Sequence, residues 1–287
     1  MDGFLTHQHF KYFKLAGIVT MLGTLLYIFH QPQQEPNGGT WLGYLLGTVS
    51  ALLIIWLIYY GRRKRDYTST NGTIRGWLSA HVYLGSSLLI LATLHTGFQF
   101  GLNIHTLAYV LMCLAIFSGF YGAWAYVTYP VKKRNNLDGR TLEEHFRSVE
   151  DVDRLIRNTT EGLPQHINAV VNSSIERTEV GGSFWEQVSA RDKSKLYIDG
   201  RLQDNEDQQS CISLLVTELS ALTEPDKIQQ TKVLIDLFTQ RKNILIKIRH
   251  DIKCNALMQI WLFFHIPVSI ALLAALVAHI FAVFIYW

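Results

Sequence analysis

One long stretch without a charged side chain constrains this chain more than any other feature. Between residues 76 and 131 there is no Asp, Glu, Lys or Arg. About 20 mostly apolar residues cross the hydrocarbon core of a bilayer, so the stretch is too long for one membrane helix and long enough for two. Residues 99–103 form its natural break. We therefore predict two spans here, at residues 77–98 and 105–129.

Three other segments are apolar over a comparable length. They lie at residues 15–29, 41–60 and 254–287, and the first is the shortest. Only 17% of all residues are charged and 49% are hydrophobic, whereas about 25% are charged in an average soluble domain. The sequence therefore predicts an all-α integral membrane bundle of five transmembrane helices.

The charged residues are concentrated in one segment. Of the 23 acidic residues 20 lie between Lys132 and Lys253, together with 19 of the 26 basic ones. We therefore predict three parts: a membrane region with four helices at 1–131, a mostly helical soluble insert at 132–253, and a fifth membrane helix at 254–287. The net charge of +3 gives no reason to expect a nucleic-acid partner.

Basic residues also indicate the orientation in the membrane. Lys and Arg cluster at 62–65 and at 132–134, whereas the loops at 31–40 and 99–104 contain neither. Short loops rich in Lys and Arg remain in the cytoplasm. The sequence thus predicts a multi-pass protein of the cell inner (cytoplasmic) membrane, with its N-terminus and insert cytoplasmic and its C-terminus outside. The third and fifth spans then run in the same direction.

Four histidines in those two spans are the strongest functional signal. His81 and His95 lie in the third span, and His265 and His279 lie in the fifth. Both pairs are 14 residues apart, which on an α-helix returns to within about 40° of the same face after a rise of about 21 Å. In parallel helices His81 therefore lies at the depth of His265, and His95 at the depth of His279.

Two facing imidazoles at each of two depths meet the needs of a haem iron with two axial ligands. The porphyrin is apolar and fits between the helices of a bundle. Glycines could let a ring approach the backbone, although small residues also mark ordinary membrane packing. They are Gly85 and Gly97 near the histidines of the third span, and Gly17, Gly23, Gly43, Gly47, Gly119 and Gly122 on the other spans. The three cysteines form neither a CxxC nor a CxxCH motif, which argues against covalent haem and cysteine metal clusters.

This pattern of histidines resembles that of the membrane di-haem cytochromes b, in which a four-helix bundle holds each haem between two histidines. Its place on the third and fifth spans is also similar to the ferric-reductase-like and NADPH-oxidase haem domains. The resemblance covers the spans but not the insert, and it implies two non-covalent haem b groups. His81 and His265 would bind the cytoplasmic one, and His95 and His279 the outer one.

The same resemblance implies transmembrane electron transfer, with redox partner proteins of the iron–sulfur or c-type cytochrome kind. A Pro-Glu-Trp-Tyr quinol motif is absent, as is a flavin or nicotinamide domain after the fifth span. We therefore expect an electron-transfer subunit of a larger oxidoreductase complex rather than a self-contained enzyme. Membrane lipid is a further expected partner, and quinol stays an open alternative.

Other interpretations of the histidines remain open. They could bind or relay a metal ion or proton in a transporter, although such sites usually recruit Asp or Glu, which these spans lack. The chain could also be a membrane sensor that signals through the insert. His105 and His30 border spans at the outer side, where an interfacial role is the simplest interpretation, although each could instead contact a quinone or bind haem.

Two arginines are candidate partners for the anionic haem propionates. Arg75 precedes the third span and Arg249 precedes the fifth. The preference of basic residues for the cytoplasmic side explains the same positions without a ligand.

The insert shows several helix and turn signals. Thr141 and Glu144 fit a capping box at the start of a helix, and further helices are predicted at 163–175 and 210–222. An Asp-Gly pair at 199–200 is typical of a hairpin. A long amphipathic pattern from residue 228 to 252 contains neither Gly nor Pro, so this helix could continue into the fifth span. We see no nucleotide or flavin motif in the insert.

Overall fold

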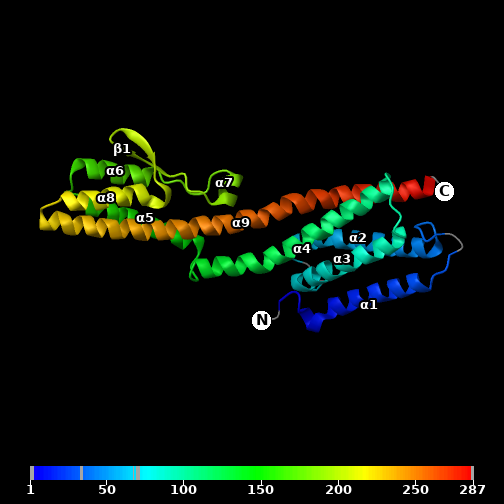
Figure 1. Cartoon of the computed structure of the whole chain (residues 1–287). Helices are drawn as coiled ribbons and strands as arrows, with labels where there is room; N and C mark the ends of the chain where they lie inside the picture. The colour runs from blue at the N-terminus through cyan, green and yellow to red at the C-terminus, as the bar shows by residue number, and fades with distance from the viewer. Residues whose placement is uncertain (1–2, 33–34, 67, 69–71, 286–287) are drawn as a thin grey trace. The chain divides into compact units, whose positions relative to one another are not determined.

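The computed structural model describes residues 3–32, 35–66, 68 and 72–285 and is all-α apart from one small hairpin (Figure 1). Five of its helices are long and apolar enough to cross a membrane. They are α1 (His7–Phe29), α2 (Trp41–Arg65), α3 (Ile74–Thr96), α4 (Ile104–Asn136) and α9 (Pro225–Ile285). The predicted five-span bundle is confirmed as a fold class. Residues 286–287, at the end of the predicted fifth span, lie outside the described residues.

The chain divides into two compact units. One unit contains residues 1–124 and 261–287, and the other contains residues 125–260. These boundaries fall inside α4 and α9, seven residues outside each end of the insert expected from its charges. The second unit is longer than the expected insert because α4 and α9 each continue from the charged segment into the apolar one without a break.

Threonine caps fix where two membrane helices begin. The Thr40 side chain accepts a hydrogen bond from the Gly43 amide at the start of α2, and Thr73 does the same for Gly76 at the start of α3, both at 3.1 Å. Such caps satisfy backbone N–H groups that have no partner within the helix. They therefore set the starting points of the two helices.

The third span ends two residues earlier than the sequence pattern suggested. Gly97 has φ +59° and ends α3 in the left-handed conformation, which glycine adopts at little cost. A Cβ atom at this position would also overlap the backbone of Pro36. The chain therefore turns at Gly97, although the apolar pattern continues into Phe98.

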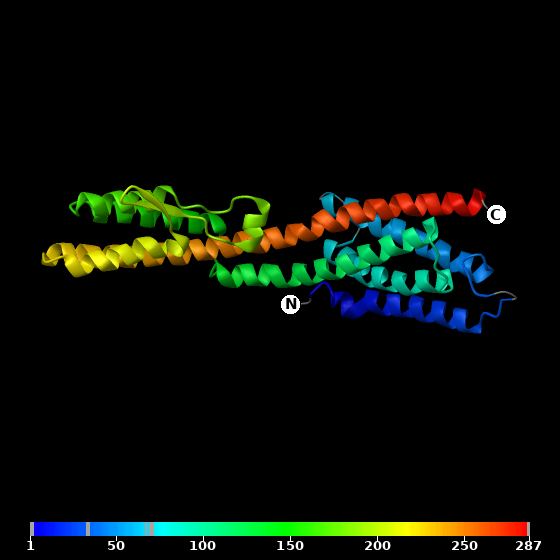
Figure 2. The same ribbon diagram turned by 45° about the horizontal axis from the view of Figure 1, so that its top comes forward.

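Close packing in the membrane unit centres on α3. The backbones of α1 and α2 both pack closely against it, as the ribbons in Figures 1 and 2 show. Buried apolar side chains connect all five helices in one cluster, including Leu57, Leu88, Met112 and Leu276. α1 and α2 thus pack against α3, although neither carries one of the four predicted histidines.

The second unit has an apolar core of its own. Its helices are α5 (Leu142–Thr160), α6 (Gln165–Glu176), α7 (Phe184–Ser189) and α8 (Gln209–Ala221), followed by the first part of α9. Ile156, Ile167, Leu196, Leu215 and Phe238 are fully buried in this core. The capping box of Thr141 and Glu144 is present, so the predicted start of α5 is confirmed. The short helix α7 was not predicted.

The hairpin also forms where the sequence predicted it. Strand β1 (Lys195–Ile198) pairs antiparallel with β2 (Arg201–Asp204), and Ile198 lies opposite Arg201. Asp199 and Gly200 between them have φ values of +49° and +74°. Positive φ at both central residues is the geometry that favours Asp-Gly in two-residue hairpin turns.

Candidate functional site

The four predicted histidines meet as two pairs within the membrane unit. The ring centroids of His81 on α3 and His265 on α9 lie 6.5 Å apart. Those of His95 and His279, on the same two helices, lie 6.1 Å apart. Since both pairings follow the same chain order, α3 and α9 run in parallel here. The predicted juxtaposition is confirmed, while ligand binding by these residues stays a prediction.

The spacing within each pair fits two ligands on opposite sides of one metal ion. A ring nitrogen that binds a metal ion lies about 2 Å from it, which puts the centroids of two opposed imidazoles about 6 Å apart. The ring planes make angles of 68° and 85° in the two pairs. Each ring can rotate about its bond to the metal, so these angles are compatible with shared coordination.

A contact with helix α2 determines which ring nitrogen of His95 carries the proton. Its Nδ1 atom lies 2.7 Å from the carbonyl oxygen of Gly43. A carbonyl can only accept a hydrogen bond, so Nδ1 of the neutral ring carries the proton and Nε2 keeps its lone pair. A Cβ atom on Gly47 would lie 2.6 Å from Cε1 of the same ring. The close approach of α2 therefore depends on the missing side chain at Gly47.

Helix α4 provides the corresponding contact for His265. Its Nδ1 lies 2.8 Å from Oγ of Ser118, and that hydroxyl donates to the Ala115 carbonyl at 2.8 Å. Since the hydroxyl proton is used in this way, Oγ accepts from the imidazole. The Nε2 atom of His265 is again the nitrogen with a lone pair. Gly119 lies beside the same ring, and a Cβ there would be 3.7 Å from Cε1.

His279 contacts His105, for which the sequence favours an interfacial role over a quinone contact or a haem ligand. Nδ1 of His105, at the start of α4, lies 2.5 Å from Nδ1 of His279, and their ring centroids are 4.6 Å apart. Only the alignment of α4 with α9 reveals this contact. The sequence predicts only that the start of α4 lies at the depth of the end of α9, because the two spans run antiparallel.

The fourth histidine has no comparable side-chain contact. Nδ1 of His81 is buried and has no hydrogen-bond partner among the described residues, although the backbone of Leu57 on α2 lies close to the ring. The Tyr60 ring lies 5.1 Å away between centroids. Gly43 and Leu57 are 14 residues apart on α2, as are His81 and His95 on α3. α2 therefore faces both histidines of α3 with residues at the matching spacing.

The two arginines occupy different environments. Arg75 is exposed in the first turn of α3, six residues before His81. Arg249 is buried within the second unit, where it forms ion pairs with Asp192 at 2.8 Å and Asp207 at 3.4 Å. These carboxylates account for the buried charge of Arg249 without a propionate, so we omit this residue from the proposed site.

Two facing imidazoles at each of two depths are a donor set that haem can use. Across residues 3–32, 35–66, 68 and 72–285, no group of three or more His, Cys, Asp or Glu side chains could hold a metal ion. A porphyrin supplies four nitrogen ligands itself, so two imidazoles complete the coordination of its iron. The paired spacing and the Nδ1 contacts of His95, His265 and His279 therefore fit haem.

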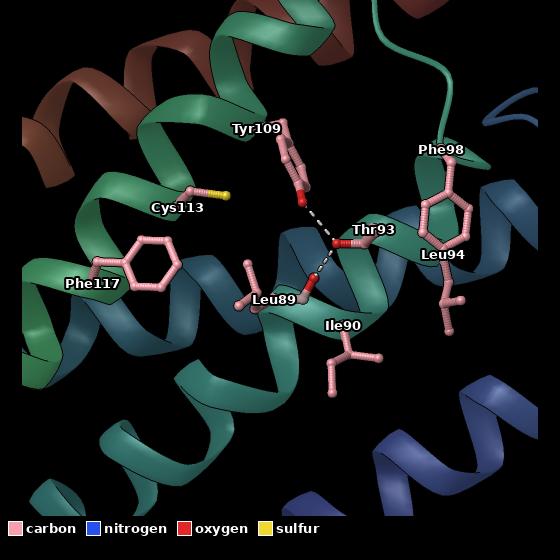
Figure 3. Close-up of a pocket in the computed structure, with 8 residues that line it drawn as sticks. All are labelled: Leu89, Ile90, Thr93, Leu94, Phe98, Tyr109, Cys113 and Phe117. Carbon is pink, nitrogen blue, oxygen red and sulfur yellow. Dashed lines mark hydrogen bonds between the residues drawn. The ribbon is translucent and has the colours of Figure 1, made fainter.

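An apolar groove lies between α3 and α4 (Figure 3). Two of the residues that line it, Thr93 and Leu94, directly precede His95 in the sequence. It has a volume of about 450 Å³ and is lined mostly by apolar residues. The Thr93 hydroxyl lies 2.8 Å from the Tyr109 hydroxyl and 2.7 Å from the Leu89 carbonyl. Because these polar groups satisfy one another, the groove presents a mostly apolar surface.

Comparison with known proteins identifies no relative. No family model, curated protein or solved structure matches the chain.

Proposed function

We propose that this protein transfers single electrons across a membrane as a di-haem cytochrome b. The observation that supports the proposal is the pairing of His81 with His265 and of His95 with His279 on parallel helices, at 6.5 and 6.1 Å. Each pair would hold one non-covalent haem b by its Nε2 atoms. When bound, haem supplies an iron centre that gains and loses one electron.

The protein's own contribution is to position and insulate the two sites. The spacing of the histidines separates the sites by about 21 Å along the helices, which covers most of a hydrocarbon core of about 30 Å. Between the histidines, Leu84 and Leu88 on α3 and Leu272 and Leu276 on α9 are at most 8% exposed. These apolar side chains exclude water from the region between the two sites.

The cellular setting belongs to the same proposal. The basic segments at 62–65 and 132–134 favour a cytoplasmic N-terminus and insert in the inner membrane. Electrons would then pass between protein partners of the iron–sulfur or c-type cytochrome kind, or a quinol, on opposite sides of the membrane. We assign the chain the role of a subunit within a larger redox complex.

The test is the haem content and spectrum of the full-length purified protein. We expect a reduced-minus-oxidised spectrum with a b-type α band and about two haems per chain by the pyridine haemochrome assay. His279→Ala should reduce this to one haem per chain. His166→Ala is the matched control, because His166 lies in the second unit and pairs with Glu218 at 3.2 Å.

Other outcomes would contradict the proposal. A colourless preparation with stoichiometric zinc would favour a metal transporter, and a colourless preparation without metal would favour a sensor. Two haems in the His279→Ala protein would refute the ligand role of that residue.

A further inference from the structure

The histidines of α9 have their Nδ1 atoms close to side chains of α4. Ser118 lies at 2.8 Å from His265 and His105 at 2.5 Å from His279. By contrast, the contact of His95 is a backbone carbonyl of α2. A carbonyl is present whatever the residue, whereas a side-chain partner can differ between the two sites.

The direction of each hydrogen bond follows from the proposed function, on which this inference rests. A neutral imidazole that binds iron through Nε2 carries its proton on Nδ1. His279 must then donate to His105, so Nδ1 of His105 accepts and its own proton lies on Nε2. At the other site His265 donates to Ser118, whose hydroxyl proton already goes to Ala115.

We propose that His105 is a positioning residue that lowers the midpoint potential of the outer haem, and that Ser118 is its counterpart for the inner haem. An acceptor on the outer nitrogen of an axial imidazole orients the ring and makes it a stronger electron donor. A more electron-rich ligand stabilises ferric over ferrous iron. An imidazole nitrogen is a stronger acceptor than a hydroxyl, so the effect is larger at the outer haem.

The positions of the two residues support a specific role. His105 opens α4, and Ser118 lies further along the same helix. Their separation of 13 residues is close to the 14 residues between His265 and His279 on the antiparallel α9, so each lies at the depth of its partner histidine. Ser118 also bonds within its own helix, which holds its oxygen in place for the imidazole.

The experiment is redox potentiometry with EPR of the ferric low-spin signals, on the purified full-length protein. His279→Ala first identifies the outer haem as the one that it removes. His105→Leu should then raise the outer midpoint potential, shift the outer EPR signal and leave the inner haem unchanged. His105→Asn, which keeps an oxygen close to the position of Nδ1, should restore both readouts towards wild type. Ser118→Ala should raise the inner potential alone, and by less.

The results separate this inference from the proposed function. A wild-type protein without haem would overturn both. Two haems in the wild type, together with an unchanged outer potential and EPR signal in His105→Leu, would overturn this inference alone. If His105→Leu loses the outer haem, retention of that haem in His105→Asn supports positioning through the hydrogen bond. Loss of the outer haem in both variants would refute positioning through the hydrogen bond.

Discussion

His95 donates a hydrogen bond from Nδ1 to the carbonyl oxygen of Gly43, 2.7 Å away on the neighbouring helix. The backbone of α2 thereby sets the orientation of a ring on α3. The same contact requires the two helices to lie very close together. The outer site therefore depends on the absence of a side chain where α2 faces the ring.

Gly47 should be essential for the outer site. A methyl group at this position would lie 2.6 Å from Cε1 of His95, so Gly47→Ala must displace the ring or the helix. We expect the variant to bind one haem per chain instead of two. Gly61→Ala on the same helix is the matched control, because nothing lies within 4 Å of the added atom. Equal haem content in the two variants would contradict the contact.

The two histidines of one pair should be equivalent in the haem assay. His81→Ala and His265→Ala each remove one member of the pair at 6.5 Å, so both should lose the same haem and keep the other. The remaining EPR signal should therefore be identical in the two variants. Different remaining signals would show that these histidines belong to different sites.

Arg249 should stabilise the second unit rather than tune a haem. Its side chain is 7% exposed and that of its partner Asp192 is 2% exposed, and removal of one member of such a buried pair costs about 3 to 5 kcal/mol. Arg249→Ala should lower the temperature at which the insert becomes sensitive to protease in the full-length protein. Arg147→Ala, whose exposed pair with Glu143 contributes little, should have almost no effect. A shifted haem potential with unchanged protease resistance would instead indicate a propionate contact.

Acid should loosen the short helix α7. Hydrogen bonds from Lys193 and Ser183 lower the pKa of Glu186 from 4.5 to about 2. A lowered pKa means that the carboxylate stabilises the fold above pH 4.5 and loses this effect as the pH falls towards 2. The fluorescence of the neighbouring Trp185, isolated by comparison with Trp185→Phe, should change over this range. Glu186→Gln should remove the change, and an unaltered transition would contradict the assignment.

Cys211 should be inert until the second unit opens. It is fully buried, and burial raises the pKa of its thiol to about 12, so almost no reactive thiolate exists near neutral pH. In a protein with Cys113→Ser and Cys254→Ser, a thiol reagent should label Cys211 only after denaturation. Arg249→Ala should accelerate labelling. Rapid labelling of the otherwise unaltered protein would show that this core is not closed.

The membrane fold could be predicted because it depends on composition over long segments. The absence of charge between residues 76 and 131 and the requirement for about 20 apolar residues per span suffice to predict two helices. Exact helix ends depend on single contacts, such as the approach of Pro36 to Gly97. The apolar pattern contains no information about that contact, so the predicted end of α3 was two residues late.

The histidine pairs could be predicted for a similar reason, since a helical period and a shared direction determine their depths. The contacts of His105 and Ser118 could not, because they depend on how α4 is rotated and shifted against α9. Arg249 was assigned to the propionates from its position before the fifth span alone. Its partner Asp192 lies far earlier in the sequence, and only the folded second unit brings the two together.

The wide separation of the paired histidines along the chain has a consequence for biosynthesis. His265 follows His81 by 184 positions, which at about 5–20 residues per second takes a ribosome about 10 to 40 s. During this interval α3 is already made while its partner helix does not yet exist. If the two pairs bind haem as proposed, neither could hold it with two ligands until α9 emerges, so a cell would need to deliver haem late in synthesis or after release.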